Sequence, residues 1–395
     1  MTAHLPHFGQ ADSLLSIDLD AITHNWRTLD RLSAPETETA AVVKADGYGL
    51  GAPLIAPPLA AAGCRTFFVM SLAEAMTLRA ALAEAGFADC RIFTLSGIHA
   101  GQEDDYAAHN ITPVINNLEQ FQRLATIGSK TGSPLAAALH VDTGMSRLGF
   151  DRDEVAWLRK AYDGGSDTTQ AVAPCLLMSH LSASEDLDDV ASSRQLADFT
   201  ALRGSLPQIP ASLANSGGSF LGAPYHFDMT RPGIALYGLH PAGADMTGAQ
   251  PDQALALQPA VTWQARILQQ RRAEAGDRVG YNGTHVMTRE SRIATVGVGY
   301  ADGYPRSLGN RAKVDIGGQS APVVGRVSMD SITVDVTDID QAVVDEAGFA
   351  TLLGDSYPLA EMARDAGTIG YEILTQLGQR PKRRFKGGQK SQSGA

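Results

Sequence analysis

Over the first part of the chain, short apolar runs alternate with longer amphipathic stretches. Eight apolar runs occur, at residues 40–44, 66–70, 91–95, 112–115, 136–141, 174–179, 211–215 and 229–238. Between them apolar residues recur at intervals of three and four, as Val155, Leu158 and Tyr162 do, and this spacing predicts helices. Buried strands that alternate with helices run parallel and are joined by crossover connections. Eight such units in about 240 residues favour a TIM-like (β/α)8 barrel over an open doubly wound sheet.

The pattern changes in the last third of the chain. Short alternating runs separated by glycine-containing and Met-Asp turns predict strands at residues 260–267, 292–300, 312–316, 321–328, 331–336 and 350–354. We expect no helix among them before residues 358–367. The chain should therefore contain a barrel over residues 14–250 and a mainly β domain over residues 251–385. The run at 14–19 is also typical of a strand, so the N-terminus, including residues 1–13, is expected to associate with the β domain.

Composition and charge exclude several classes of protein. With 44% hydrophobic and 19% charged residues among 395, the chain has the composition of a globular protein. Its apolar runs are shorter than the ~20 residues of a membrane helix, and residues 1–13 lack the features of a signal peptide. A formal net charge of −11 disfavours binding to nucleic acid. We therefore expect a cytoplasmic protein that binds neither membrane nor nucleic acid.

The cysteines and the basic C-terminal segment do not indicate a functional site. Cys64, Cys90 and Cys175 are scattered and lack metal-binding spacing, so we expect reduced thiols and no metal site. From Pro381 onward the chain carries several basic side chains and no acidic one. We expect residues 386–395 to form a disordered tail rather than a binding segment.

Three of the predicted strand ends carry residues that suit a cofactor. Lys44 closes the first buried strand, where desolvation lowers the pKa of a lysine and makes its amine a better nucleophile. Ser216 and the pair Gly233 and Ile234 follow the last two strands, where barrels often bind phosphate. Taken singly, the lysine could point to solvent, and the serine and glycine could be ordinary turn residues. Taken together, they favour pyridoxal phosphate held as a Schiff base on Lys44.

Eight motifs extend this pattern over nearly the whole chain. They are AVVKADGYG (41–49), VDTGMSRLG (141–149), Ser179-His180, Asn215-Ser216, RPGIALYG (231–238), GYADGYPR (299–306), GRVSMD (325–330) and YEILTQLGQRP (371–381). In their order and spacing they resemble the alanine racemase family, which joins a pyridoxal-phosphate barrel to a β domain. The resemblance implies an isomerase that interconverts L- and D-alanine, either supplying D-alanine for the peptidoglycan of the cell wall or degrading it.

The resemblance also implies a role for each matching residue. Lys44 and Tyr281 would be the two catalytic bases. Arg231 would donate to the pyridine nitrogen, while Arg147 and the backbone N–H of Met329 would hold the substrate carboxylate. The other cofactor-binding positions would be Tyr48, His180, Asn215, Ser216, Gly233, Ile234 and Tyr371, and the supporting positions His140, Tyr300 and Asp330.

The chemistry of racemisation agrees with these roles. A proton must leave one face of the substrate Cα and return on the other, which two bases do directly. In the family the tyrosine comes from the partner subunit, so the resemblance implies a homodimer with shared sites for a small amino-acid substrate. Arginine keeps its proton, so Arg231 would leave the pyridine nitrogen unprotonated, which weakens the ring as an electron sink and disfavours transamination.

Other functions remain open at this point. One is a serine or broad-specificity racemase, or a basic amino-acid decarboxylase, on the same scaffold. A decarboxylase would need an acid where Arg231 stands, and broad-specificity racemases are typically exported. Another is a non-catalytic carrier of pyridoxal phosphate, which would have no use for Tyr281.

Two positions depart from the family's pattern. His140 stands where many members carry a carbamylated lysine, and Ser212 where a histidine is frequent. Histidine forms no stable carbamate, so Arg147 needs another acceptor for its charge. We expect a bound anion such as chloride, or Asn116 or Asn117, to supply it, with His140 neutral. The alternative is that water reaches Arg147 and no substitute is needed.

Overall fold

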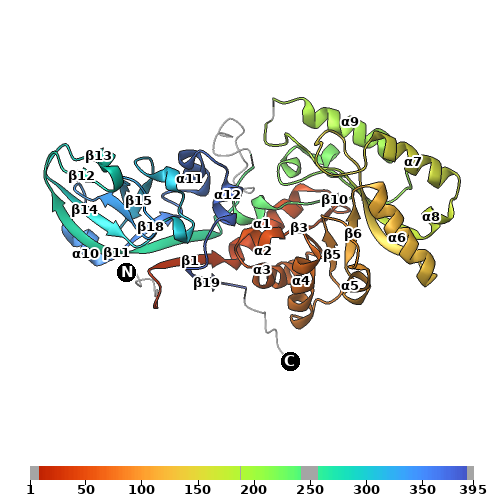
Figure 1. Ribbon diagram of the computed structural model, residues 1–395, viewed down its shortest axis with the longest axis horizontal. Coiled ribbons are helices and arrows are strands. Elements are labelled where there is room, and N and C mark those ends of the chain that lie inside the picture. Colours follow the sequence, from red (N-terminus) through yellow and green to blue (C-terminus); the bar gives the residue numbers. More distant parts are fainter. Residues whose placement is uncertain (1–8, 187, 242–256, 389–395) are drawn as a thin grey trace. The chain divides into compact units, whose positions relative to one another are not determined.

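The computed structural model describes residues 9–241, except residue 187, and residues 257–388. It divides into two compact units (Figure 1). One unit combines the chain up to Ala21 with the segment from Gln258 onward, and the other begins at Ile22. The first division thus falls after Ala21 rather than at residue 14, because the first strand belongs to the C-terminal sheet. The boundary expected at residues 250–251 lies outside the described residues.

The larger unit is built on parallel strands that follow the apolar runs of the sequence. Seven of them form one sheet in sequence order: β3 (Ala41–Val42), β4 (Thr66–Val69), β5 (Arg91–Thr94), β6 (Thr112–Ile115), β7 (Leu135–His140), β8 (Val172–Met178) and β9 (Ala211–Ser212). The eighth run gives β10 (Met229–Thr230), which pairs in parallel with β2 (Glu38–Thr39). Backbone bonds of 2.9 Å from Arg231 N to Ala214 O and from Val42 N to Pro232 O tie this segment to both ends of the sheet. The predicted TIM-like barrel is therefore confirmed.

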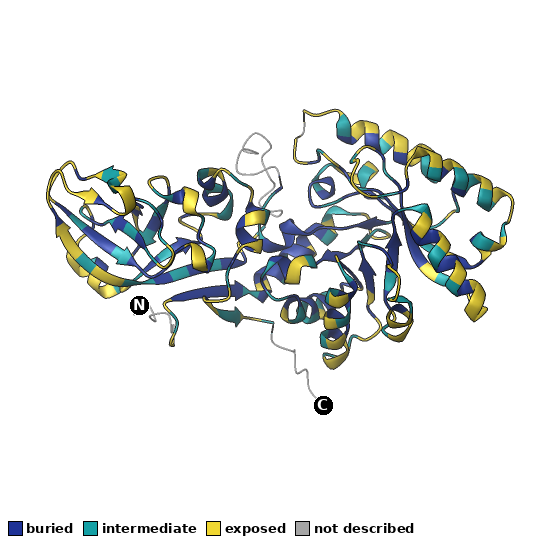
Figure 2. Ribbon diagram, in the orientation of Figure 1, coloured by how far each residue is buried: buried dark blue, intermediate teal, exposed yellow. Residues whose placement is uncertain are grey.

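Helices cover the outside of this barrel (Figure 2). They are α1 (Leu19–Leu32), α3 (Ala52–Ala62), α4 (Leu72–Glu84), α5 (Glu103–Ala108), α6 (Leu118–Thr131), α7 (Arg152–Asp163), α8 (Asp167–Gln170) and α9 (Ala191–Arg203). Side chains of Ser71, Asn117 and Asp151 cap α4, α6 and α7 by accepting backbone N–H groups. Inside the strands, Phe68 stacks on Phe93 with ring centroids 4.9 Å apart, within a larger apolar cluster. This packing fixes the positions of the strand ends.

The smaller unit is mainly β structure. Its eight-stranded sheet contains β1 (Ser13–Asp18), β11 (Val261–Ala273), β14 (Ser291–Val296), β15 (Lys313–Ile316), β16 (Gln319–Pro322), β17 (Ile332–Asp335), β18 (Phe349–Leu353) and β19 (Lys382–Lys386). A separate pair is formed by β12 (Arg278–Val279) and β13 (His285–Val286). Strand β1 pairs with β11 antiparallel and with β19 in parallel. The expected association of the N-terminal strand with the β domain is confirmed.

Two expectations for this unit are wrong. Lys386, expected to begin a disordered tail, ends strand β19, and Gly388 N donates to Asp20 Oδ1 at 3.0 Å. The rest of the expected tail, residues 389–395, lies outside the described residues. Basic side chains suit an edge strand such as β19, because charge discourages further strand pairing.

The second wrong expectation concerns helices. Helix α10 (Gln341–Ala347) lies between strands where none was expected, before α11 (Leu359–Ala366) and α12 (Gly370–Thr375). At seven residues it is too short to show a helical repeat, and its start is set by Asp340, whose carboxylate accepts the Ala342 N–H.

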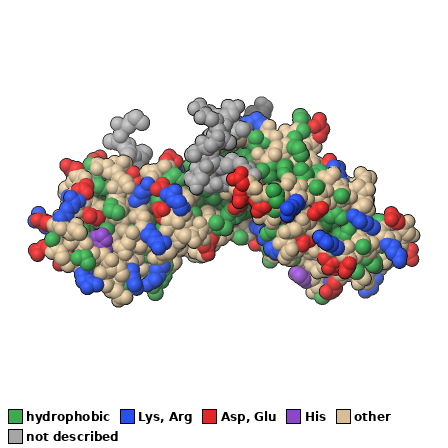
Figure 3. Space-filling view, turned by 90° about the horizontal axis from the view of Figure 1, so that it is seen from above, with side chains coloured by type: hydrophobic (Ala, Val, Ile, Leu, Met, Phe, Trp, Pro, Cys, Tyr) green, Lys and Arg blue, Asp and Glu red, His purple; other side chains and the backbone are tan. Residues whose placement is uncertain are grey.

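Two further observations concern membrane-spanning helices and the distribution of surface charge. Among the described residues, no helix combines the length and the apolar character that crossing a membrane requires. On the face shown in Figure 3, acidic and basic side chains are interspersed.

Candidate active site at the carboxyl ends of the barrel strands

Lys44 stands directly after β3, at the start of a left-handed turn labelled α2 (Lys44–Tyr48). The turn has φ values of 54° at Ala45, 54° at Asp46, 63° at Gly47 and 59° at Tyr48. For residues other than glycine this conformation costs ~1–2 kcal/mol each. Strain of this kind persists only where surrounding contacts impose it, and it gathers at functional sites.

Glu74 on α4 supplies contacts that impose this turn. Its two carboxylate oxygens accept the N–H groups of Ala45, at 3.1 Å, and Met70, at 2.7 Å. They therefore join the turn to the end of β4. Burial and the charge of Arg147 lower the pKa of Lys44, while Glu74 opposes that change. The amine of Lys44 is thus held at a fixed strand end and is closer to its neutral, nucleophilic form.

A phosphate-sized cradle follows β9 and β10. Ser216 Oγ accepts the Gly233 N–H at 2.8 Å. A Cβ on Gly233 would lie 2.2 Å from Tyr48 Oη, so only glycine fits there. Ile234 begins the short helix η3 (Ile234–Tyr237), and its N–H has no partner within that helix. A hydroxyl and two backbone N–H groups therefore meet beside a buried tyrosine.

Asn215 shapes the loop that carries Ser216. Its Oδ1 accepts the Gly218 N–H at 2.9 Å and the Ser184 hydroxyl at 2.7 Å, and its Nδ2 donates to Leu181 O at 3.2 Å. The polar atoms of Asn215 are therefore already engaged by protein groups, and the residue holds Ser216 in place.

Arg231 is buried in the centre of the barrel mouth. Its guanidinium donates to Ser179 O at 2.5 Å and to the hydroxyl of Ser212, which occupies the family's frequent histidine position. Burial lowers the pKa of Arg231 to about 9, which leaves it charged at neutral pH. Asp228 pairs with Arg203 at 2.8 Å. The guanidinium of Arg231 therefore belongs to the barrel mouth rather than to a surface ion pair with Asp228.

His140 ends strand β7 and pairs with its neighbour at the end of β6. His140 Nδ1 lies 2.8 Å from Asn116 Oδ1, so the ring donates there. Burial, with the charge of Arg231, lowers the pKa of His140 to about 4, in agreement with the predicted neutral ring. Asn116 binds His140 and Asn117 caps α6, so neither of these two expected acceptors is paired with Arg147, and the bound anion stays a prediction. Arg147 is exposed and makes no hydrogen bond to another described residue.

His180, after β8, belongs to a network that the sequence did not suggest. Burial and the charge of Arg231 lower its pKa well below the ordinary value, so the ring is neutral. Its carbonyl oxygen accepts from Gln195 Nε2 at 2.8 Å, and the same amide reaches Thr143 Oγ1 at 3.3 Å. Gln195 on α9 is fully buried and has no motif signature, so no sequence signal pointed to it.

We expect His140 to make stability depend on pH between about 6.5 and 4. Its folded-state pKa of about 4 lies below the ordinary 6.5, so the unfolded chain binds the proton more readily and stability falls as pH falls. At pH 5 this loss amounts to about 2 kcal/mol. His140→Gln keeps a donor for Asn116 without titrating, so its urea midpoint should drop less between about pH 7 and pH 5. Replacement of the exposed His99 by glutamine serves as the control, and identical drops in all three proteins would contradict this role.

The remaining predicted site residues lie in the smaller unit. Tyr300 and Met329 sit on adjacent turns, joined by a 3.0 Å bond from Ala301 N to Met329 O, and both side chains are exposed. Tyr281 begins the short helix η6 (Tyr281–Gly283) and is 70% exposed. Tyr371 lies on α12. The larger unit thus gathers the predicted residues from Lys44 to Ile234, and the smaller unit carries the others.

Asp330 is held next to Met329 by an ion-pair network. Arg380 Nη1 lies 2.7 Å from Asp330 Oδ1, and its Nε lies 3.2 Å from Asp302 Oδ1. Asp302 is buried, and its second carboxylate oxygen accepts the Gly299 N–H at 2.9 Å. Arg380 therefore clamps together the two turns that carry Tyr300 and Met329.

Comparison with known proteins identifies this architecture. Residues 17–241 match the alanine racemase N-terminal domain and residues 260–385 the alanine racemase C-terminal domain. Alanine racemase of Brucella canis is 43% identical over 94% of this chain and 92% of the relative, and the catabolic alanine racemase of Agrobacterium fabrum is 41% identical over 95% and 93%. The crystal structure of alanine racemase from Bartonella henselae with covalently bound pyridoxal phosphate superposes with a TM-score of 0.87 at 40% identity, covering 95% of this chain and 100% of that one. The chain belongs to the alanine racemase family.

Proposed function

We propose that Lys44 and Tyr281 are the two bases with which this pyridoxal-phosphate-dependent isomerase interconverts L- and D-alanine. The observation that carries the proposal is the placement of Lys44. Its amine, with a lowered pKa, stands on a strained turn whose Tyr48 lies against the cradle of Ser216 and Gly233. The experiment that tests both residues is their separate replacement, described in the Discussion.

The residues of the larger unit fit pyridoxal phosphate. Lys44 offers the amine that its aldehyde requires. The Ser216 hydroxyl and the Ile234 N–H offer donors for its phosphate, and the Gly233 N–H, which donates to Ser216 Oγ in this structure, would add a third if it turned to the phosphate. The tight approach of Tyr48 to Gly233 closes one side of the cradle. When bound, the group withdraws electrons from the substrate and makes its Cα proton acidic. We propose that Tyr371 adds a further hydroxyl to the phosphate.

Arg231 and the two neutral histidines set the electrostatics of this site. Arg231 is charged and buried, so it can donate to the pyridine nitrogen but cannot lend it a proton. His180 and His140 remain neutral beside it, because burial, and then the charge of Arg231, lowers the pKa of both rings. The histidines therefore act as hydrogen-bonding groups, with His180 proposed to face Tyr281.

The substrate carboxylate is proposed to bind Arg147 and the backbone N–H of Met329. Arg147 is suited to this because its exposed guanidinium forms no hydrogen bond within the described part of the chain. A guanidinium can hold a carboxylate through two parallel hydrogen bonds, which fixes orientation as well as position.

Replacing Arg380 by alanine is expected to raise the KM for L-alanine several-fold while changing kcat little. The change leaves the buried Asp302 without its cation and frees the turn that positions Met329. Steady-state racemisation measured by circular dichroism provides both constants. The exposed Arg364 of α11 gives the matched control, Arg364→Ala. A KM equal to that of the parent would show that Arg380 does not position this turn.

We propose that the enzyme is a homodimer in which Tyr281 completes the partner's site. Tyr281 is strongly exposed, as a side chain that enters another subunit must be before assembly. Mixing inactive Lys44→Ala and Tyr281→Ala subunits should then restore activity. Half of randomly formed dimers are mixed and one of their two sites is intact, so recovery should reach about a quarter of the parent activity. Subunit exchange without recovery would exclude shared sites.

We further propose that the enzyme acts in the cytoplasm and supplies D-alanine for peptidoglycan. All three cysteines are free thiols, which suits a reducing compartment. Expression in a bacterium that requires D-alanine should restore growth without the supplement. Failure to restore growth, despite activity in the extract, would contradict this supply of D-alanine.

A further inference from the structure

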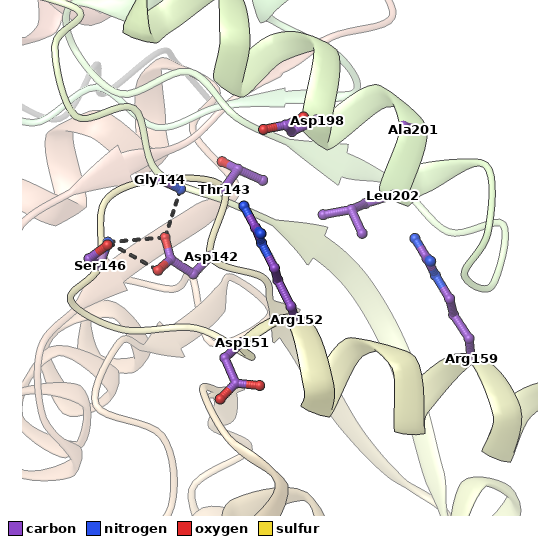
Figure 4. A pocket seen from close by; sticks show the side chains of 10 residues that line it. All are labelled: Asp142, Thr143, Gly144, Ser146, Asp151, Arg152, Arg159, Asp198, Ala201 and Leu202. Atoms are coloured by element: carbon purple, nitrogen blue, oxygen red, sulfur yellow. Dashed lines mark hydrogen bonds between the residues drawn. The ribbon is translucent and has the colours of Figure 1, made fainter.

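A groove of about 450 Å³ lies between α7 and α9, beside the loop that follows β7 (Figure 4). Neither Lys44 nor the phosphate cradle contributes to it. It is lined by Asp142, Thr143, Gly144, Ser146, Asp151, Arg152, Arg159, Asp198, Ala201 and Leu202.

Arg152 and Arg159 extend from the same face of α7 into this groove. Seven residues make two helical turns, so their Cα atoms stand about 10 Å apart along the axis. Figure 4 shows both side chains directed from α7 toward α9. Neither forms an ion pair with another described residue, and Arg159 Nε is buried without a hydrogen-bond partner. Arg152 is exposed and Arg159 is half-buried. The buried Nε–H of Arg159 has no acceptor, which is costly, so this part of the groove is suited to an anionic oxygen.

The acidic residues of the groove leave these arginines free. The Asp142 carboxylate accepts backbone N–H groups of its own loop, Gly144 among them at 2.9 Å. Asp151 caps α7, where its side chain accepts the Glu154 N–H. Asp198 is exposed on α9, across from the arginines, and it disfavours highly charged ligands by repulsion. The lining therefore holds three carboxylates, of which Asp142 and Asp151 are directed to backbone N–H groups, against two guanidinium groups. This balance excludes highly charged ligands and favours one of modest charge with two separated anionic ends, each on one arginine.

We propose that this groove binds a small dicarboxylate, with one carboxylate on Arg152 and the other on Arg159. The planar guanidinium matches a carboxylate through two parallel hydrogen bonds, and two such pairs set the ligand's length as well as its charge. A monocarboxylate can satisfy only one of the arginines.

The groove is connected to the substrate-binding loop by hydrogen bonds. Gln195, one turn before Asp198 on α9, bonds to Thr143 Oγ1 and His180 O. Thr143 Oγ1 lies 2.7 Å from Ser179 Oγ, and Ser179 O accepts from Arg231. A ligand held along α7 between the two arginines would lie against Thr143 and Gly144 and would therefore steady the loop that carries Arg147. This consequence, a lower KM for alanine, rests on the role proposed above for Arg147.

Calorimetric titration of the holoenzyme in saturating racemic alanine, which occupies the proposed carboxylate position at Arg147, tests the site, with glutarate as the probe and propionate at equal ionic strength as the monocarboxylate. Glutarate should bind at least roughly tenfold more tightly than propionate, the difference expected for one additional charge-assisted pair. Arg152→Gln and Arg159→Gln should each remove that advantage, while Arg194→Gln, on α9 but outside the groove, should retain it. Far-ultraviolet circular dichroism establishes that each variant is folded.

Several results would overturn the proposal. They are equal affinity for glutarate and propionate, undetectable glutarate binding, glutarate affinity unchanged in both groove variants, and tighter binding of pyrophosphate than of glutarate. An unchanged KM for alanine with glutarate bound would remove the coupling to the loop. Absence of racemisation in the parent enzyme would count against the proposed function alone, because binding is measured without net turnover.

Discussion

Replacing Lys44 by alanine is expected to lower racemisation of L-alanine by more than ~10⁴-fold, the largest effect of any single change. The substitution removes a proton-transfer group, which by itself contributes about 10² to 10⁴-fold. It also removes the amine to which the cofactor is attached. The absorbance band of lysine-bound cofactor, near ~420 nm, should disappear together with the activity.

The control for this change is Lys130→Ala, which removes an exposed lysine at the end of α6. Both proteins should retain the parent's far-ultraviolet circular dichroism, because Lys44 contributes no hydrogen bond to the core packing described above. Retention of racemisation above one-hundredth of the parent rate in Lys44→Ala would refute its assignment as base and attachment site.

Replacing Tyr281 by phenylalanine is expected to lower kcat for L-alanine by about 10² to 10⁴-fold while leaving the absorbance of the bound cofactor unchanged. Only the hydroxyl that exchanges a proton on one face of the substrate is removed. The ring is 70% exposed, so its loss of a hydroxyl leaves no buried polar group unsatisfied.

The spectrum separates this variant from Lys44→Ala, which should lose activity and absorbance together. Tyr225→Phe, a change in the larger unit away from the strand ends that carry the site, is the matched control. Turnover equal to that of the parent in Tyr281→Phe would exclude the hydroxyl as the second base. The same assay with L-serine in place of L-alanine measures the enzyme's preference between the two substrates.

The barrel could be predicted from the sequence because a parallel strand buried on both faces is a continuous apolar run. The runs at residues 40–44, 136–141 and 229–238 mark strands β3, β7 and β10 for this reason. Strand β2, which pairs with β10, could not be predicted from periodicity, since it has two residues and no repeat can show in it. Helix α10 was not predicted either, because its seven residues are too few to show a helical repeat.

The candidate site was predictable where a residue's type and its place on a strand end were sufficient. Lys44, Ser216 and Gly233 could be identified in this way. Pairings between side chains on neighbouring strands could not be predicted, because they depend on which strand ends meet. Asn116 was one of the acceptors considered for Arg147, and it bonds to His140 instead. The role of Gln195 in the site could not be predicted, because a buried amide on an outer helix has no sequence signature.

The pairing of β1 with β19 governs the order in which the protein can fold during synthesis. Leu14 lies opposite Lys382 in the parallel register, so the second partner of this strand is synthesised 368 residues later (382 minus 14). At 5 to 20 residues per second, the delay is roughly 20 to 70 s. Leu14, Leu15 and Ile17 are all fully buried in the finished sheet. During this delay they lack the contacts that β19 later provides. The barrel can close while the chain is still growing, but the N-terminal strand must await the synthesis of β19 and until then is open to aggregation or to a chaperone.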